Sequence, residues 1–162
     1  MNNKLNVLLS DLVVFYHKLQ NKHWYVSGQS FFQIHPELEN LYNAVLPQVD
    51  TVGELILMNG GKPVSTLKEF LANAKLSEGT DEYVTSVKTL YTELLPDYQY
   101  LLKSVTEIKE AADAENNYLA SAKMGWQFQP SFITICIFQP VYSTFGNITL
   151  FYSLVGYDYL PL

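Results

Sequence analysis

Five residues, His23, His35, Glu39, Asp50 and Glu54, have the types and spacing that favour metal chemistry. The chain contains only three histidines, and two of them belong to this set. At about 100° per residue from His35, the three carboxylates fall at about 40°, 60° and 100°, so all four residues share one helix face. Imidazole and carboxylate ligands without a thiolate suit Fe(II), Mn(II) or Zn(II). The set predicts a metal site with positions left open for an oxidant.

The length of this helix predicts that two copies of the chain build the site. His35 and Glu54 would lie about 28 Å apart at 1.5 Å per residue, so one ion cannot contact both ends. A second, antiparallel copy across a two-fold axis would place His35 and Glu39 of one chain against Asp50 and Glu54 of the other. We expect His23 beside His35, because a short loop returns the first helix against the second.

Each of these residues also has an ordinary structural interpretation. An acidic pair four residues apart, such as Asp50 and Glu54, is commonly a solvated helix face, and a histidine that follows an apolar stripe, as His23 does, commonly packs or caps. Trp24 is either interface packing or an electron donor beside an oxidising site. Taken together, the residues favour the metal site, because the histidine end and the carboxylate end of the helix come together only when a two-fold axis relates two chains.

Apolar residues at three- and four-residue spacing predict an all-α chain. Gly28 is the expected end of the first helix, and Ser30 with Gln33 is a candidate capping box for the second. Pro47 and Pro96 are expected to kink their helices. The expected helices are 4–27, a second ending near Met58, a short segment at 67–76, a third long helix at 81–112, and a fourth starting near Asp113.

Composition narrows the classes of function. The net charge is −6, and the ten basic residues are all lysines. Duplex binding depends on clustered Lys and Arg, so we expect little or no direct DNA binding. The single cysteine, Cys136, excludes an internal disulfide framework and fits a reducing compartment. With no apolar leader after Met1, we expect a cytoplasmic protein.

The character of the sequence changes near residue 123. From Met124 to Leu162 the only charged side chain is Asp158, in a segment rich in aromatic and β-branched residues. We divide the chain into a helical bundle at 1–123 and an atypical tail at 124–162. We interpret the tail as out-of-frame or otherwise degenerate coding. It has too many polar residues for a confident membrane span.

Specific motifs resemble the Dps family of mini-ferritins. His23-Trp24-Tyr25-Val26-Ser27-Gly28, followed by Phe31 to His35 and then Glu39, looks like the first signature of the family. Asp50-Thr51-Val52-Gly53-Glu54, followed by Asn59 to Pro63 and Thr66 to Phe70, resembles its second signature and its short helix between the second and third long helices. The resemblance covers residues 4–120.

The resemblance implies a ferritin-like four-helix bundle that assembles as a hollow dodecamer. His23, His35 and Glu39 of one chain and Asp50 and Glu54 of its partner would be iron ligands. Fe(II) would be oxidised there, preferably by hydrogen peroxide rather than oxygen, and stored as Fe(III) oxide, which protects the cell from oxidative damage. Trp24 resembles a family aromatic that quenches one-electron by-products.

Departures from the family pattern leave two other interpretations open. Leu55 stands where the signature usually has an arginine, and after about Lys123 the chain stops resembling the family's fourth helix. One alternative is a degenerate Dps-like protein that binds metal but assembles poorly. The other is a non-catalytic interaction protein that docks its aromatic tail on a membrane or a partner.

Overall fold

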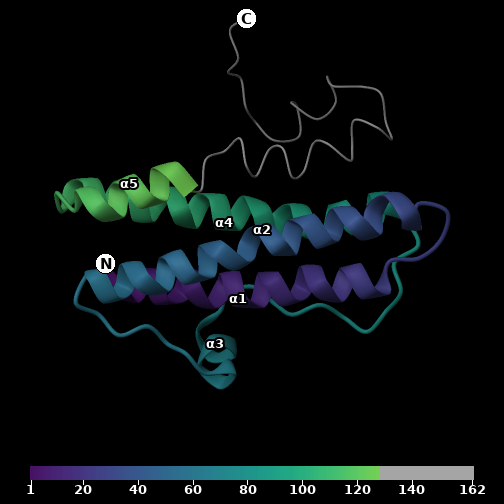
Figure 1. Ribbon diagram of the computed structural model, residues 1–162, viewed down its shortest axis with the longest axis horizontal. Helices are drawn as coiled ribbons and strands as arrows, with labels where there is room; N and C mark the ends of the chain where they lie inside the picture. The colour runs from purple at the N-terminus through teal and green to yellow at the C-terminus, as the bar shows by residue number, and fades with distance from the viewer. Residues whose placement is uncertain (128–162) are drawn as a thin grey trace, which may run out of the picture.

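Three long helices lie alongside one another and carry two shorter ones (Figure 1). The structure is a computed structural model that describes residues 1–127. α1 packs against α2, α3 and α4, and α5 turns back along α4. This arrangement confirms the predicted helical bundle with a short extra helix. The helices are α1 (Asn2–Tyr25), α2 (Phe31–Met58), α3 (Leu67–Asn73), α4 (Val87–Ala114) and α5 (Tyr118–Gln127).

The apolar stripes read from the sequence form the core. Leu5, Leu12 and Leu19 of α1 are fully or almost fully buried, as are Leu38 and Val52 of α2. Complete burial of a side chain of this size contributes about 1.5–3 kcal/mol. Phe15 meets Tyr98 of α4 edge-to-face with ring centroids 4.8 Å apart. The buried residues of α4 are Leu90, Leu94, Tyr98, Leu101, Val105, Ile108 and Ala112.

Polar side chains of α1 hold the long connection between α2 and α4. The Asn6 Oδ1 atom accepts a 2.8 Å hydrogen bond from the Val64 backbone N–H. The completely buried Asp11 carboxylate accepts hydrogen bonds from the backbone N–H groups of Lys75 and Leu76, at 2.6 and 2.9 Å. A second Asp11 oxygen accepts the Tyr100 hydroxyl of α4 at 2.8 Å. Asp11 therefore joins α1, the connection and α4 at one buried point.

α1 ends before the expected Gly28, and α4 begins after the expected Asp81. The reason is an isolated parallel bridge between Val26 and Val84. The Val84 N–H donates to the Tyr25 carbonyl at 3.0 Å, and the Ser27 N–H donates to the Val84 carbonyl at 2.9 Å. Val84 fits the apolar spacing of α4, but these bonds hold its backbone in an extended conformation, so α4 begins after it. Ser86, whose hydroxyl accepts the Thr89 N–H, is the N-cap of α4.

The fourth helix begins at Tyr118, so the start expected near Asp113 is wrong. α4 continues to Ala114, and Asn116 then adopts a left-handed conformation with φ of 55°. Asparagine tolerates this region better than other residues that have a Cβ atom. The Asn117 side chain accepts the Ala120 N–H at 3.1 Å at the first turn of α5. A run that looks uniformly helical in sequence is therefore divided by an Asn-Asn turn.

The ends of α2 and α3 differ in detail from the expectations. Ser30 is the N-cap of α2, but its side chain makes no capping hydrogen bond, so the expected capping box with Gln33 is wrong. A complete capping box occurs instead at α3, between Thr66 and Glu69. α2 continues through Pro36 and Pro47, and α4 through Pro96.

The interpretations placed on residues 128–162 lie outside the described part of the chain. These are the interpretation of the tail as out-of-frame or degenerate coding and almost all of the predicted tail itself, 124–162. Among the helices of residues 1–127, none is long and apolar enough to cross a membrane.

Candidate metal site

His23 at the end of α1 and His35 near the start of α2 form a reciprocal pair. The His23 Nδ1 atom lies 2.8 Å from the backbone carbonyl of His35, and the His35 Nδ1 atom lies 2.9 Å from the carbonyl of His23. The two imidazoles stack with their centroids 3.7 Å apart and their planes at 25°. The two histidines are therefore neighbours within one chain, as predicted.

This pairing determines which nitrogen of each ring can bind a metal. A backbone carbonyl is only an acceptor, so each Nδ1 must carry the hydrogen of its bond. The unprotonated lone pair of each neutral imidazole is then on Nε2. A hydrogen bond from the other ring nitrogen to a carbonyl is the usual way in which a metal-binding histidine is oriented. His23 is buried and His35 is partly buried.

Aromatic rings surround the histidine pair. Phe31 stacks on His35 with centroids 4.6 Å apart. Tyr42 of α2 meets the His23 ring edge-to-face at 5.4 Å, and Tyr16 of α1 meets Tyr42 in the same way at 5.6 Å. Desolvation and the nearby Glu39 carboxylate raise the pKa of Tyr42, so its phenol is protonated at neutral pH. Sequence reasoning missed Tyr42.

The three predicted carboxylates do not join the histidines within one chain. Glu39, Asp50 and Glu54 all lie on α2 and are exposed to solvent. Across residues 1–127, no three His, Cys, Asp or Glu side chains lie close enough together to hold a metal ion. Because α2 is one unbroken helix, Glu54 is about 28 Å from His35 along its axis. A single chain thus presents a histidine pair and, separately, a row of exposed carboxylates.

Trp24 and His17 are both exposed. The Trp24 side chain is 59% exposed, and within residues 1–127 its indole makes no ring contact with His23 or His35. His17 lies on the exposed side of α1.

Two ion pairs between α1 and α4 fix the segment that carries His23. Lys22 Nζ lies 2.7 Å from Glu93 Oε2, and Lys18 Nζ lies 2.6 Å from Asp97 Oδ2. Both lysines are buried. The Lys18–Asp97 contact is a charge contact without the alignment of a hydrogen bond. In the sequence, the two lysines are four residues apart on one helix, and the two acidic residues are four residues apart on the helix that packs against it. This spacing is the signal that could have predicted the ion pairs.

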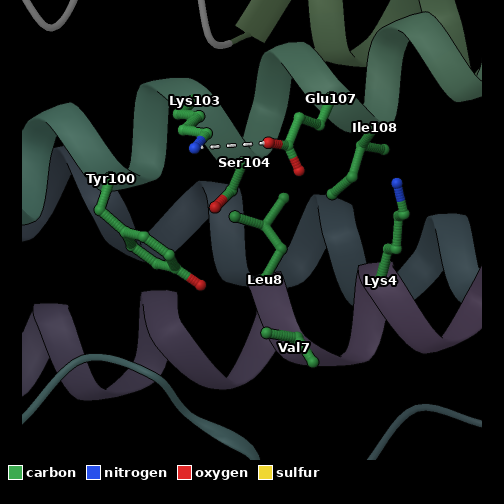
Figure 2. Close-up of a pocket in the computed structure, with 8 residues that line it drawn as sticks. All are labelled: Lys4, Val7, Leu8, Tyr100, Lys103, Ser104, Glu107 and Ile108. Carbon is green, nitrogen blue, oxygen red and sulfur yellow. Dashed lines mark ion pairs between the residues drawn. The ribbon is translucent and has the colours of Figure 1, made fainter.

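A surface groove between α1 and α4 is separate from the histidine pair (Figure 2). Its volume is about 350 Å³, at the small end of the range for ligand pockets. The exposed Lys103–Glu107 pair, with N and O atoms 3.9 Å apart, spans one side of it. None of the predicted metal ligands lines this groove; its lining is Lys4, Val7, Leu8, Tyr100, Lys103, Ser104, Glu107 and Ile108.

The fold agrees with a known class of proteins. Residues 2–130 match the family model of the ferritin-like domain. A crystal structure of the DPS protein from Vibrio cholerae O1, described as a member of a broad superfamily of ferritin-like diiron-carboxylate proteins, superposes with a TM-score of 0.76. The two sequences are 26% identical, and the match covers 83% of this chain and 85% of that one.

Sequence relatives narrow the class to a family. DNA protection during starvation protein 2 of Bacillus anthracis is 33% identical over 117 residues, which cover 72% of this chain and 79% of the relative. The DNA protection during starvation protein of Listeria innocua is 34% identical over 135 residues, covering 77% and 86%. The chain belongs to the Dps family of ferritin-like proteins. This membership confirms the resemblance seen in the sequence motifs.

Proposed function

We propose that this chain oxidises Fe(II), preferably with hydrogen peroxide, at a site shared by two subunits and stores the Fe(III) product. The observation that carries the proposal is the histidine pair with both Nε2 atoms available, to which residues 1–127 of the same chain add no third ligand that would complete a metal site. Two imidazoles alone are a weak site for Fe(II), which also favours carboxylate ligands. A partner must supply them.

In a two-fold dimer, the partner's copy of α2 supplies the missing carboxylates. If two α2 helices pair antiparallel, His35 and Glu39 of one subunit lie against Asp50 and Glu54 of the other, and His23 completes the set. The exposure of Asp50 and Glu54 in the single chain supports this pairing, because ligands for a partner's site must not be used internally.

In the proposed reaction, iron is the substrate. Two Fe(II) ions each lose one electron, the O–O bond of peroxide breaks, and its oxygens leave as water or enter the Fe(III) oxide. The carboxylates offset the increasing positive charge, and the oriented imidazoles hold the ions through Nε2. Using peroxide and Fe(II) together removes the two reactants that generate hydroxyl radicals.

The wider proposal follows the family. We propose assembly into a dodecamer whose cavity holds the oxide, in the cytoplasm. The net charge of −6 without arginine supports protection by iron oxidation in preference to direct DNA binding.

Complementation between two inactive variants tests the shared site. We would co-express His35→Ala chains and Asp50→Ala chains with different tags and isolate the assemblies that contain both. In a shared site, the His35 of one chain meets the Asp50 of its partner, so about a quarter of the sites is intact at equal expression and random pairing. Fe(II) oxidation by peroxide, measured by absorbance, should return to about that fraction of wild type.

The single variants and a carboxylate control complete the experiment. Each variant alone should oxidise iron no faster than buffer, and Glu110→Ala, which removes an exposed carboxylate of α4, should resemble wild type. Mixed assemblies as inactive as the single variants would show that each chain holds its own site and would contradict the proposal. Light scattering on the wild-type protein distinguishes a cage from the dimers or aggregates of a protein that assembles poorly.

A further inference from the structure

The surface groove between α1 and α4 combines an apolar floor with a charged rim (Figure 2). Leu8 of α1 and Ile108 of α4 are 1% and 2% exposed, so the floor is the edge of the helical core. The lining residues of each helix are spaced three and four apart, which places them on one face of that helix. The groove shares no residue with the proposed iron site.

Tyr100 forms a fixed wall of this groove. Its hydroxyl donates a 2.8 Å hydrogen bond to the completely buried Asp11 carboxylate, and the Ser104 hydroxyl hydrogen-bonds to the same phenol. Asp11 also accepts two backbone N–H groups, so three donors compensate its charge. The Tyr100 ring therefore keeps its orientation without a ligand, and a pre-formed site loses less entropy when a ligand binds.

The rim carries a local excess of positive charge, with Lys4 and Lys103 beside a single acid, Glu107. The Lys103–Glu107 contact is long at 3.9 Å, and its side chains are 76% and 51% exposed, so it contributes little. Lys4 is exposed and extends from α1 toward α4, and it has no ion pair within residues 1–127. Two weakly paired ammonium groups thus flank an apolar floor, in a chain whose net charge is −6.

We propose that this groove binds a small aromatic carboxylate with a single ring. The ring lies on Leu8 and Ile108 beside the Tyr100 ring, because aromatic rings pack favourably edge-to-face or offset. The carboxylate faces the ammonium groups of Lys4 and Lys103. The groove volume of about 350 Å³ is at the small end of the range for ligand pockets, which favours a ligand of one ring.

The charges of the rim favour an anion over other occupants. A cation would meet two ammonium groups and one carboxylate that already lies beside Lys103. A neutral ring gains only its contact with the floor and the Tyr100 wall. Glu107 opposes an anion, so the acid and the two lysines of the rim should affect binding in opposite directions.

The probe is 4-fluorobenzoate, titrated against the whole protein and followed by the width of its fluorine NMR line. The neutral analogue 4-fluorobenzamide has nearly the same shape and serves as the ligand control. We expect the carboxylate to bind with a dissociation constant on the order of 1 mM, and the amide to bind at least about fivefold more weakly. Added salt should weaken binding of the carboxylate, because both lysines are exposed.

Variants of the rim test the location of the site. Lys4→Gln and Lys103→Gln should each weaken binding about two- to fivefold. Glu107→Gln should strengthen binding by about the same factor, since it removes the repelling charge and releases Lys103. Lys88→Gln, which removes an exposed lysine of α4 outside the groove, should bind as wild type does. All four side chains are exposed, so we expect each variant to fold.

Opposite responses to the loss of a rim lysine and to the loss of Glu107 would support the proposed site. It would be overturned by undetectable binding of the carboxylate, by equal affinity for the amide, or by lysine variants that bind as tightly as wild type. Equal weakening in Lys88→Gln, or a Glu107→Gln variant that binds no more tightly than wild type, would also overturn it. Iron takes no part in this measurement, so its result is independent of the proposed function.

Discussion

The imidazole of His23 bonds to the backbone carbonyl of His35, and the imidazole of His35 bonds to the backbone carbonyl of His23. Each bond uses the main chain of the partner residue, so each hydrogen bond can form without the other side chain. The end of α1 and the start of α2 are joined by the two residues that we propose as iron ligands. The corner where α1 ends and α2 begins therefore carries both histidines of the proposed site within one chain.

Replacing His35 should separate metal binding from stability. In His35→Ala, the His23 ring keeps its backbone acceptor, so we expect a loss of stability of only about 1 kcal/mol. We expect Zn(II), a redox-inert probe, to bind at least about tenfold more weakly. Calorimetric titration and urea unfolding measure the two effects. Unchanged Zn(II) affinity would show that His35 is not a ligand.

The buried Lys18–Asp97 pair should matter more than the exposed Lys103–Glu107 pair. Asp97→Asn leaves a buried lysine without its counter-charge, and we expect a loss of about 3 kcal/mol in the free energy of unfolding. Glu107→Gln is the matched control, and its cost should stay below about 0.5 kcal/mol because both partners are mostly exposed. Urea unfolding measures both, and equal losses would contradict this assignment.

Asp11 should be the most sensitive polar residue of the connection between α2 and α4. Asp11→Ala leaves two backbone N–H groups and the Tyr100 hydroxyl without their acceptor, so we expect a loss of about 3–4 kcal/mol. Hydrogen exchange at Lys75 and Leu76 should accelerate first. Protection retained at these two amides would show that the connection is held by other contacts.

The stability of the protein should depend on Tyr100 at high pH. Burial, together with the Asp11 carboxylate, raises the pKa of Tyr100 from 10.0 to about 12. The unfolded chain releases this proton at lower pH than the folded chain, so this contribution is complete below pH 10 and is lost as pH rises through about 12. The free energy of unfolding of wild type, minus that of Tyr100→Phe, should therefore fall between these two pH values. A difference independent of pH would contradict the shift.

The helical pattern and the shared face of α2 were readable from the sequence. Both depend on the local period of an α-helix, which fixes the buried stripe and the angular positions of His35, Glu39, Asp50 and Glu54 without knowledge of the rest of the chain. The spacing of His23 and His35 across a short loop likewise predicted that they are neighbours. The metal role of these residues remains a prediction.

The tertiary structure decided where that local pattern stops and how the histidines are oriented. Val84 fits the stripe of α4, yet it is extended because it pairs with Val26. Asn6 and Asp11 hold backbone groups 58 to 65 residues away, and Tyr42 reaches His23 from the next helix. Contacts of this kind depend on how helices pack, and packing brings together groups whose separation along the chain follows no period. The sequence determined which faces exist, and the packing determined what each face meets.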